Sequence, residues 1–186
     1  MESVAKAAFS AVAATATLAV AATFYMWRKG GAVMVRSGKE GKLDLGKPET
    51  WPGAWSDSLE ALAPAFRVRV ARMVVALAAM GYRLGEHYVP GSTWRSKERQ
   101  RFIVDKGWSR TMRSKHAVTA ADGTPAAMAV DMFPLMAKEA EKAAFYTALM
   151  ASAEREGLVS GGSWGRTNAT WAKYGLGWDP GHVEAT

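Results

Sequence analysis

The sequence predicts an α+β fold, in which a small antiparallel sheet with flanking helices follows an N-terminal hydrophobic helix. First, segments with helical periodicity mix with short strand-like segments, without the regular alternation of a parallel βαβ fold. Second, 186 residues with 49% hydrophobic and 22% charged side chains suit one compact domain with an appendage. Third, cysteine is absent, which excludes disulfide scaffolds, thiolate metal sites and cysteine nucleophiles.

The first element is an uncharged, alanine-rich stretch, Ala7 to Trp27. As a helix it would extend about 31 Å, close to the thickness of a bilayer core. Cleavage at Ala19-Val20-Ala21 would make it a signal peptide, and retention would make it an anchor. A third alternative is a weak anchor that leaves the bilayer, as in signal-arrest-release segments. A buried helix is disfavoured because the stretch has no polar face. We expect residues 1–29 to be an uncleaved transmembrane or signal-arrest segment.

Residues 30–55 are rich in glycine and proline and predict a linker or an extended arm. A helical pattern follows, with Pro64 at its first turn and Gly81 at its end. The apolar residues that recur at helical spacing are Leu59, Leu62, Phe66, Val70, Met73, Val74 and Leu77. The domain is therefore expected to span residues 56–186.

The remaining elements follow from local pattern and turn residues. Helices are expected at residues 96–105 and 138–156, the second ending at Gly157. Strands are expected at residues 82–89, 126–133, 158–164 and 178–184.

The chain is basic, with 24 Lys and Arg against 17 Asp and Glu. Eight of the basic residues lie between Arg95 and Lys115, with only Glu98 and Asp105 to offset them. This stretch is either a solvated helix face or a surface for an anionic partner. No recognised nucleic-acid-binding motif accompanies it, so nucleic acid is not the expected partner.

Three short motifs carry candidate chemistry. Asp131 stands in an apolar, strand-like run, where a carboxylate needs a partner. Asp179-Pro180-Gly181-His182 has the pattern of a type II turn, which would bring its first and last residues together. The third motif is Ser114-Lys115-His116. Each has an ordinary explanation when taken alone: a salt bridge, a hairpin turn and a surface histidine.

Taken together, two histidines and one aspartate form a common ligand set for zinc with one open position. A second carboxylate then serves as general acid or base in metal-assisted hydrolysis, and Asp179 is placed for that role by its turn. HExxH is absent, which excludes a thermolysin-like helix site.

The ordered motifs of residues 58–184 resemble the zinc peptidases of peptidoglycan, which comprise D-alanyl-D-alanine carboxypeptidases and L-alanyl-D-glutamate endopeptidases. That family carries an SxHxxGxAxD motif and a later [DE]xxH. The matching pieces here are Gly81-Tyr82, Trp94-Arg95-Ser96 with Gln100, Ser114-Lys115-His116, Ala129-Val130-Asp131, Gly161-Gly162-Ser163-Trp164 and Asp179-Pro180-Gly181-His182.

The resemblance implies a role for each matching residue. His116, Asp131 and His182 match the zinc ligands. Asp179 matches the carboxylate that activates the attacking water and passes a proton to the leaving amine. Arg95 matches the arginine that stabilises the oxyanion. Two further residues are expected at the substrate: Ser114, which either binds it or orients the His116 loop, and Trp164.

The spacing departs from the family at one point. Fourteen residues separate His116 from Asp131, where the family usually has six. A loop over residues 117–128, turning at Asp122-Gly123, would let the two ligands converge. If it displaced His116 instead, His87 or Asp122 would have to be reconsidered as ligands. A second stretch, residues 165–177, contains Trp171 and Tyr174 and is expected to line the substrate groove.

These observations predict a monomeric zinc peptidase that lyses the cell wall, resembling a phage endolysin. The expected substrate is the peptidoglycan stem peptide, and the expected bond is L-Ala–D-Glu. The alternatives are a D-Ala-D-Ala carboxypeptidase, a non-catalytic wall-binding module and a membrane-anchored nucleic-acid binder. Export to the periplasm or cell wall is expected, with initial tethering to the inner membrane through residues 7–27.

Overall fold

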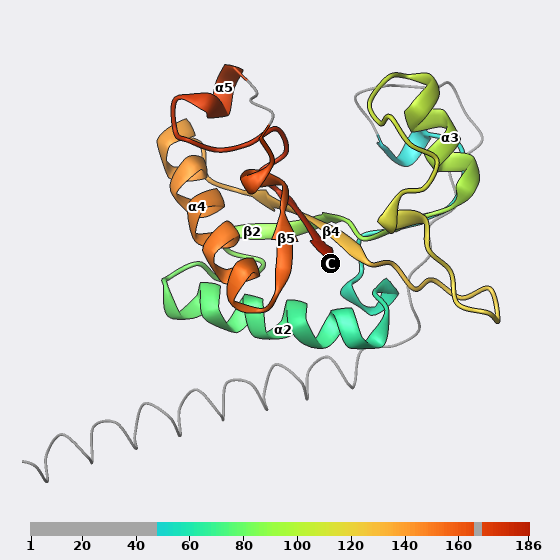
Figure 1. The fold of residues 1–186 in the computed structure, drawn as a ribbon, viewed down its shortest axis with the longest axis horizontal. Helices are drawn as coiled ribbons and strands as arrows, with labels where there is room; N and C mark the ends of the chain where they lie inside the picture. The colour runs from blue at the N-terminus through green and yellow to red at the C-terminus, as the bar shows by residue number, and fades with distance from the viewer. Residues whose placement is uncertain (1–47, 166–168) are drawn as a thin grey trace, which may run out of the picture. The chain divides into compact units, whose positions relative to one another are not determined.

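The computed structural model describes residues 48–165 and 169–186 (Figure 1). The hydrophobic segment at residues 7–27 and the linker up to residue 47 lie outside the described residues. Within the described ranges, no helix combines the length and apolar character needed to cross a membrane.

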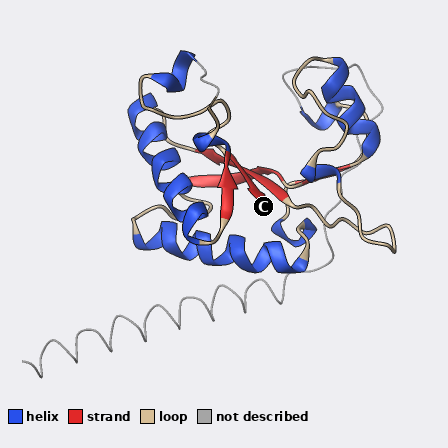
Figure 2. Ribbon diagram, viewed as in Figure 1, coloured by secondary structure: helices blue, strands red, loops and turns tan. Residues whose placement is uncertain are grey.

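Two antiparallel sheets are present in the described ranges (Figure 2). The larger sheet has the order β2-β4-β6-β5, and the smaller pairs β1 with β3. The strands are β1 (Trp55–Ser56), β2 (Tyr88–Ser92), β3 (Trp94–Arg95), β4 (Ala129–Pro134), β5 (Leu158–Ser160) and β6 (His182–Ala185). The expected α+β class with a small antiparallel sheet is confirmed.

The α-helices of the described ranges are α2 (Pro64–Ala79), α3 (Lys97–Asp105), α4 (Glu139–Arg155) and α5 (Ala169–Ala172). Short 3-10 turns are η1 (Pro48–Thr50), η2 (Leu59–Ala61), η3 (Lys115–Ala117) and η4 (Gly161–Ser163). Helices α2 and α4 pack against each other, and α4 contacts β5 (Figure 1). Helix α3 begins where the Ser96 hydroxyl accepts a hydrogen bond from the Arg99 amide, an N-cap that fixes the predicted start.

The core forms where the apolar stripe of α2 faces inward. All seven residues of the predicted periodic set are buried, and Val70, Met73 and Leu77 have no exposed surface. Leu59 and Leu62 precede the helix, because Pro64 occupies its first turn. Burying this stripe supplies the hydrophobic free energy that holds α2 in place.

Two predicted strands are displaced. Residues 82–87 form no strand but an irregular segment with an isolated bridge at Leu84 and a turn at 85–87, and β2 starts only at Tyr88. The Arg83 carbonyl accepts a hydrogen bond from the His87 amide, and Gly85 takes a positive φ of 82°, which a strand does not allow. Likewise β5 ends at Ser160, because the glycines that follow enter the η4 turn.

The end of the predicted linker belongs to the folded domain. Trp55 is buried in β1, and Trp51 packs on Trp108 with ring centroids 4.8 Å apart. Arg99 lies over both Trp51 and Trp55, at 5.2 and 4.9 Å from their ring centroids. This arginine, from the basic stretch, is buried and is therefore not part of a solvated face.

Candidate metal centre

Two of the predicted ligands are cross-strand neighbours in the larger sheet. Strand β4 pairs with β6 so that Asp131 lies directly opposite His182. Directly opposed residues place their side chains on the same face, with Cβ atoms about 4.5–5.5 Å apart. The register of one strand pair therefore brings this carboxylate and this imidazole together.

The third ligand reaches the same point from the η3 turn, which contacts both β3 and β4. The Ser114 hydroxyl caps this turn by accepting a hydrogen bond from the His116 amide, and the His116 side chain is buried. The long segment that follows is a hairpin excursion: Thr119 bridges Pro125, and Gly123 has a positive φ of 83° at the predicted turn. The chain leaves and returns, so the insertion does not displace His116.

The three donor atoms lie close to the spacing that a tetrahedral ion requires, two of the separations matching it and the third being shorter. His116 Nε2 lies 3.3 Å from His182 Nδ1 and 3.4 Å from Asp131 Oδ1, and the last two atoms are 2.9 Å apart. Bonds of about 2.0–2.1 Å to zinc imply donor separations of about 3.3 Å. The residues present therefore fit a zinc-type ion, and together they form a group that could hold a metal.

Each histidine is held at its other ring nitrogen. His116 Nδ1 lies 2.8 Å from the backbone carbonyl of Thr93, and His182 Nε2 lies 3.2 Å from Glu184 Oε2. Lys115 in turn donates to Glu184 Oε1 at 3.1 Å. Carbonyl and carboxylate partners of this kind fix the tautomer and the ring orientation of metal-binding histidines.

The electrostatics of the group favour a bound cation. Burial lowers the pKa of His182, but hydrogen bonds to Asp131 and Glu184 outweigh this and raise it to about 9. Burial raises the pKa of Asp131, but the charges and hydrogen bonds of His116 and His182 hold it well below its usual range. The buried carboxylate is therefore ionised, and a protonated imidazole or a bound metal would add to the positive charge that Arg95 supplies.

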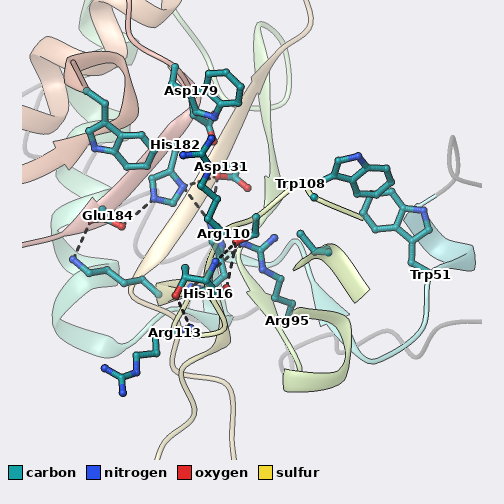
Figure 3. A pocket seen from close by; sticks show the side chains of 18 residues that line it. Trp51, Arg95, Trp108, Arg110, Arg113, His116, Asp131, Asp179, His182 and Glu184 are labelled. Carbon is teal, nitrogen blue, oxygen red and sulfur yellow. Dashed lines mark hydrogen bonds and ion pairs between the residues drawn. The ribbon is translucent and has the colours of Figure 1, made fainter. Parts of the chain in front are cut away.

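Asp179 lies on the wall of the same cleft, one turn before His182 (Figure 3). Its carbonyl accepts a hydrogen bond from the His182 amide at 3.1 Å, which closes the predicted turn. The turn is not type II, because Gly181 lacks the positive φ that this type requires. Gly181 is needed for close approach: a Cβ there would lie 2.9 Å from the Met132 carbonyl oxygen. Burial, and then the Asp131 charge, raise the pKa of the Asp179 carboxyl.

The segment that carries Asp179 and His182 packs closely against Gly161, the first glycine of the GGxW motif. A Cβ at Gly161 would lie 2.1 Å from the Asp179 carbonyl oxygen and 3.2 Å from His182 Cβ. The motif therefore requires glycine here for backbone packing. The following Trp164 lies beside His182, with ring centroids 5.2 Å apart, and lines the cleft.

Arg95 lies at the end of β3, where it lines the cleft (Figure 3). Its Nη2 donates to the Ser114 hydroxyl at 3.2 Å, while its buried Nε has no hydrogen-bond partner among the described residues. Burial lowers the pKa of Arg95, and the charges of Asp131 and Asp179 oppose this shift. Ser114 thus contacts both the arginine and the η3 turn, the orienting arrangement expected as one of its two roles.

The cleft has a volume of about 650 Å³. Trp171 and Tyr174, expected to line it, pack elsewhere: Trp171 lies against Tyr146 of α4, and the Tyr174 hydroxyl donates to Glu139. The alternative ligands also lie apart from the metal group. His87 Nδ1 accepts from the Arg83 amide, and Asp122 accepts from Thr124 in the hairpin turn.

Sequence reasoning missed several residues of the site. Glu184 had a usable signal, because residues two apart on a strand share a face and His182 is a candidate ligand. The Thr93 carbonyl had no such sequence signal, because every residue has a backbone carbonyl. The cleft residues that gave no signal include Trp51, Trp108 and Trp178, whereas Arg110, Arg113 and Lys115 come from the basic stretch that was expected to face an anionic partner.

The sequence matches no known protein-family profile. No curated protein is significantly similar to it. Similar solved structures include the L-Ala D-Glu endopeptidase ChiX of Serratia marcescens, with 21% identity, a TM-score of 0.45, and coverage of 69% of this chain and 83% of that one. DacB of Streptococcus pneumoniae has 16% identity and a TM-score of 0.42, covering 72% of each chain. The vancomycin-resistance D,D-dipeptidase VanXYg has 16% identity and a TM-score of 0.38, covering 67% of this chain and 50% of that one.

Proposed function

We propose that this chain is a zinc-dependent peptidase that hydrolyses the stem peptides of peptidoglycan, with L-Ala–D-Glu as the preferred bond. The observation that carries the proposal is the convergence of His116, Asp131 and His182 at donor separations of 2.9–3.4 Å, inside a cleft that also holds Asp179 and Arg95. The ordered motifs over residues 58–184 support the choice of substrate.

A zinc ion held by the three ligands would polarise the scissile carbonyl and lower the pKa of the attacking water. Asp179 takes a proton from that water and delivers it to the leaving amine nitrogen. Its raised pKa suits a group that must both accept and release a proton. Arg95 directs its guanidinium charge at the developing oxyanion, and its Nε is free of described partners. Trp164 limits the pocket beside His182.

The test is mass spectrometry of products released from purified peptidoglycan by the full chain, with and without a chelator. Chelator-sensitive release of peptides that begin with D-Glu is expected, together with loss of cleavage in Asp179→Asn. Release of terminal D-Ala alone would reassign the protein as a carboxypeptidase. Intact peptidoglycan in the presence of added zinc, with binding to the wall retained, would indicate a non-catalytic wall-binding module.

The proposal includes export, with tethering to the inner membrane through residues 7–27 as in a phage endolysin, on the strength of the uncharged Ala-rich stretch. Fractionation of cells that express the full chain tests this. We expect the protein with the membrane first and in the periplasm after the membrane potential is dissipated. A protein found only in the cytosol would contradict it.

A further inference from the structure

Two arginines line the cleft without a described carboxylate partner. Arg110 and Arg113 are exposed side chains of the cleft wall, and no carboxylate of residues 48–165 or 169–186 forms an ion pair with either. The other cations of this wall are engaged, since Lys115 pairs with Glu184 and Arg95 bonds to Ser114. Within the described residues, Arg110 and Arg113 thus leave positive charge in the cleft that a ligand can neutralise.

The loop that carries them is held in place by a buried glutamine. Gln100 is fully buried in α3, and its amide nitrogen donates to the Ser109 hydroxyl at 3.1 Å and to the Thr111 carbonyl at 2.5 Å. The Thr111 hydroxyl then accepts a hydrogen bond from the Arg113 amide at 2.9 Å. Because the backbone on both sides of Arg110 is fixed before a ligand arrives, less ordering entropy is lost on binding.

Aromatic side chains line another part of the cleft. Trp108 is half exposed in the cleft and packs against Trp51, and Phe102 contacts both rings at 6.2 and 5.7 Å. Figure 3 shows Trp51 and Trp108 on the side of the pocket away from His182 and Asp179. The cleft therefore combines an apolar surface, on the side away from the metal centre, with guanidinium groups that have no described carboxylate partner.

The position of the carboxylates in the cleft limits the kind of ligand that it can take. Its lining carboxylates, Asp131, Asp179 and Glu184, belong to the metal centre. A phosphodiester chain would place a negative charge at every unit, including beside Asp179. A peptide instead presents neutral amides to the metal centre and can place one carboxylate at the arginines. The arrangement therefore favours an acidic peptide over nucleic acid.

We propose that Arg110 and Arg113 form a carboxylate subsite, which recognises a free carboxylate one to three residues from the scissile bond. Arg113 is three residues from His116, so their Cα atoms lie within about 11 Å. A guanidinium group binds carboxylate through paired hydrogen bonds. In a stem peptide, the γ-linked D-Glu leaves its α-carboxylate free next to the L-Ala–D-Glu bond. The inference rests on the proposed peptidase function.

The test compares two synthetic peptides, L-Ala–γ-D-Glu–L-Lys–D-Ala with the D-Glu α-carboxyl either free or amidated. With the zinc-loaded full chain, we expect kcat/KM to be about tenfold higher for the free acid, as for two partly exposed charge-assisted contacts. The double variant R110Q/R113Q should reduce this preference to about one. R101Q is the matched control, because Arg101 is exposed in the same basic stretch and lies outside the cleft lining. It should keep the preference.

A second arm measures binding without catalysis, by fluorescence anisotropy of the labelled peptides on the chelator-treated full chain. It is expected to show the same preference and the same loss in the double variant. Cleavage of both peptides at equal rates, a preference retained in R110Q/R113Q, or an equal loss in R101Q would overturn the subsite while leaving the peptidase function intact. If neither peptide is cleaved, the proposed function fails and the binding arm still decides the subsite. Tighter binding of a DNA oligonucleotide through the same arginines would overturn the acidic-peptide assignment.

Discussion

Glu184 is predicted to tune the metal affinity of the site through His182. Its Oε2 lies 3.2 Å from His182 Nε2, and that contact leaves Nδ1 directed at Asp131 and His116. Removing a carboxylate that orients a metal-binding histidine typically lowers metal affinity by about 10–100-fold, or about 1.4–2.7 kcal/mol. Glu184→Gln keeps an oxygen acceptor, so the decrease in its metal affinity should be near the lower limit of this range. Glu184→Ala also removes the acceptor and should be near the upper limit.

The assay is competition for zinc between the full chain and a chromophoric chelator at pH 7. Glu141→Gln is the control, because Glu141 is a solvent-exposed carboxylate on α4 that pairs with Lys138. It should leave affinity unchanged. The Lys115 ammonium retains the Ala185 carbonyl as a partner in the Glu184 variants, so the folded state should persist. Zinc affinity of Glu184→Ala equal to that of the unaltered protein would refute the proposed role of this contact.

Three further predictions follow from burial and charge. In the metal-free protein the pKa of His182 is raised to about 9, so zinc should displace about one proton at pH 7. Zinc should also bind more tightly as the pH rises towards 9. Calorimetry in buffers of different ionisation enthalpy measures the proton release, and a release of zero would contradict the prediction. Gly161→Ala should reduce peptidase activity by about 100-fold, because the added methyl group would push the Asp179 segment away. Gly165→Ala should keep the activity, because its added methyl group would meet no atom within 4 Å, and equal rates in the two variants would be inconsistent with this packing. Leu77→Ala should lower the free energy of unfolding by about 2–5 kcal/mol in urea titrations, and a loss under about 1 kcal/mol would mean that α2 does not anchor the core.

Local patterns gave reliable predictions where the cause is local. The apolar spacing of residues 66–77 depends only on helical geometry, and every residue of that part of the set is buried. The start of α3 follows from the Ser96 cap, and the turn in the 117–128 insertion follows from Asp122-Gly123. The displaced start of β2 shows the limit, because residues 82–87 have strand-like composition but their backbone hydrogen bonds close local turns.

The sequence by itself determined the chemistry available to this protein: three histidines, no cysteine, and an aspartate in an apolar strand that needs a partner. Only the tertiary structure decided which of these groups meet. The meeting of His116 with His182 spans 66 positions of the chain, and it depends on the β4–β6 register and on a hairpin that returns to the sheet. Strand pairing and register are set by contacts between distant segments, which no local pattern encodes.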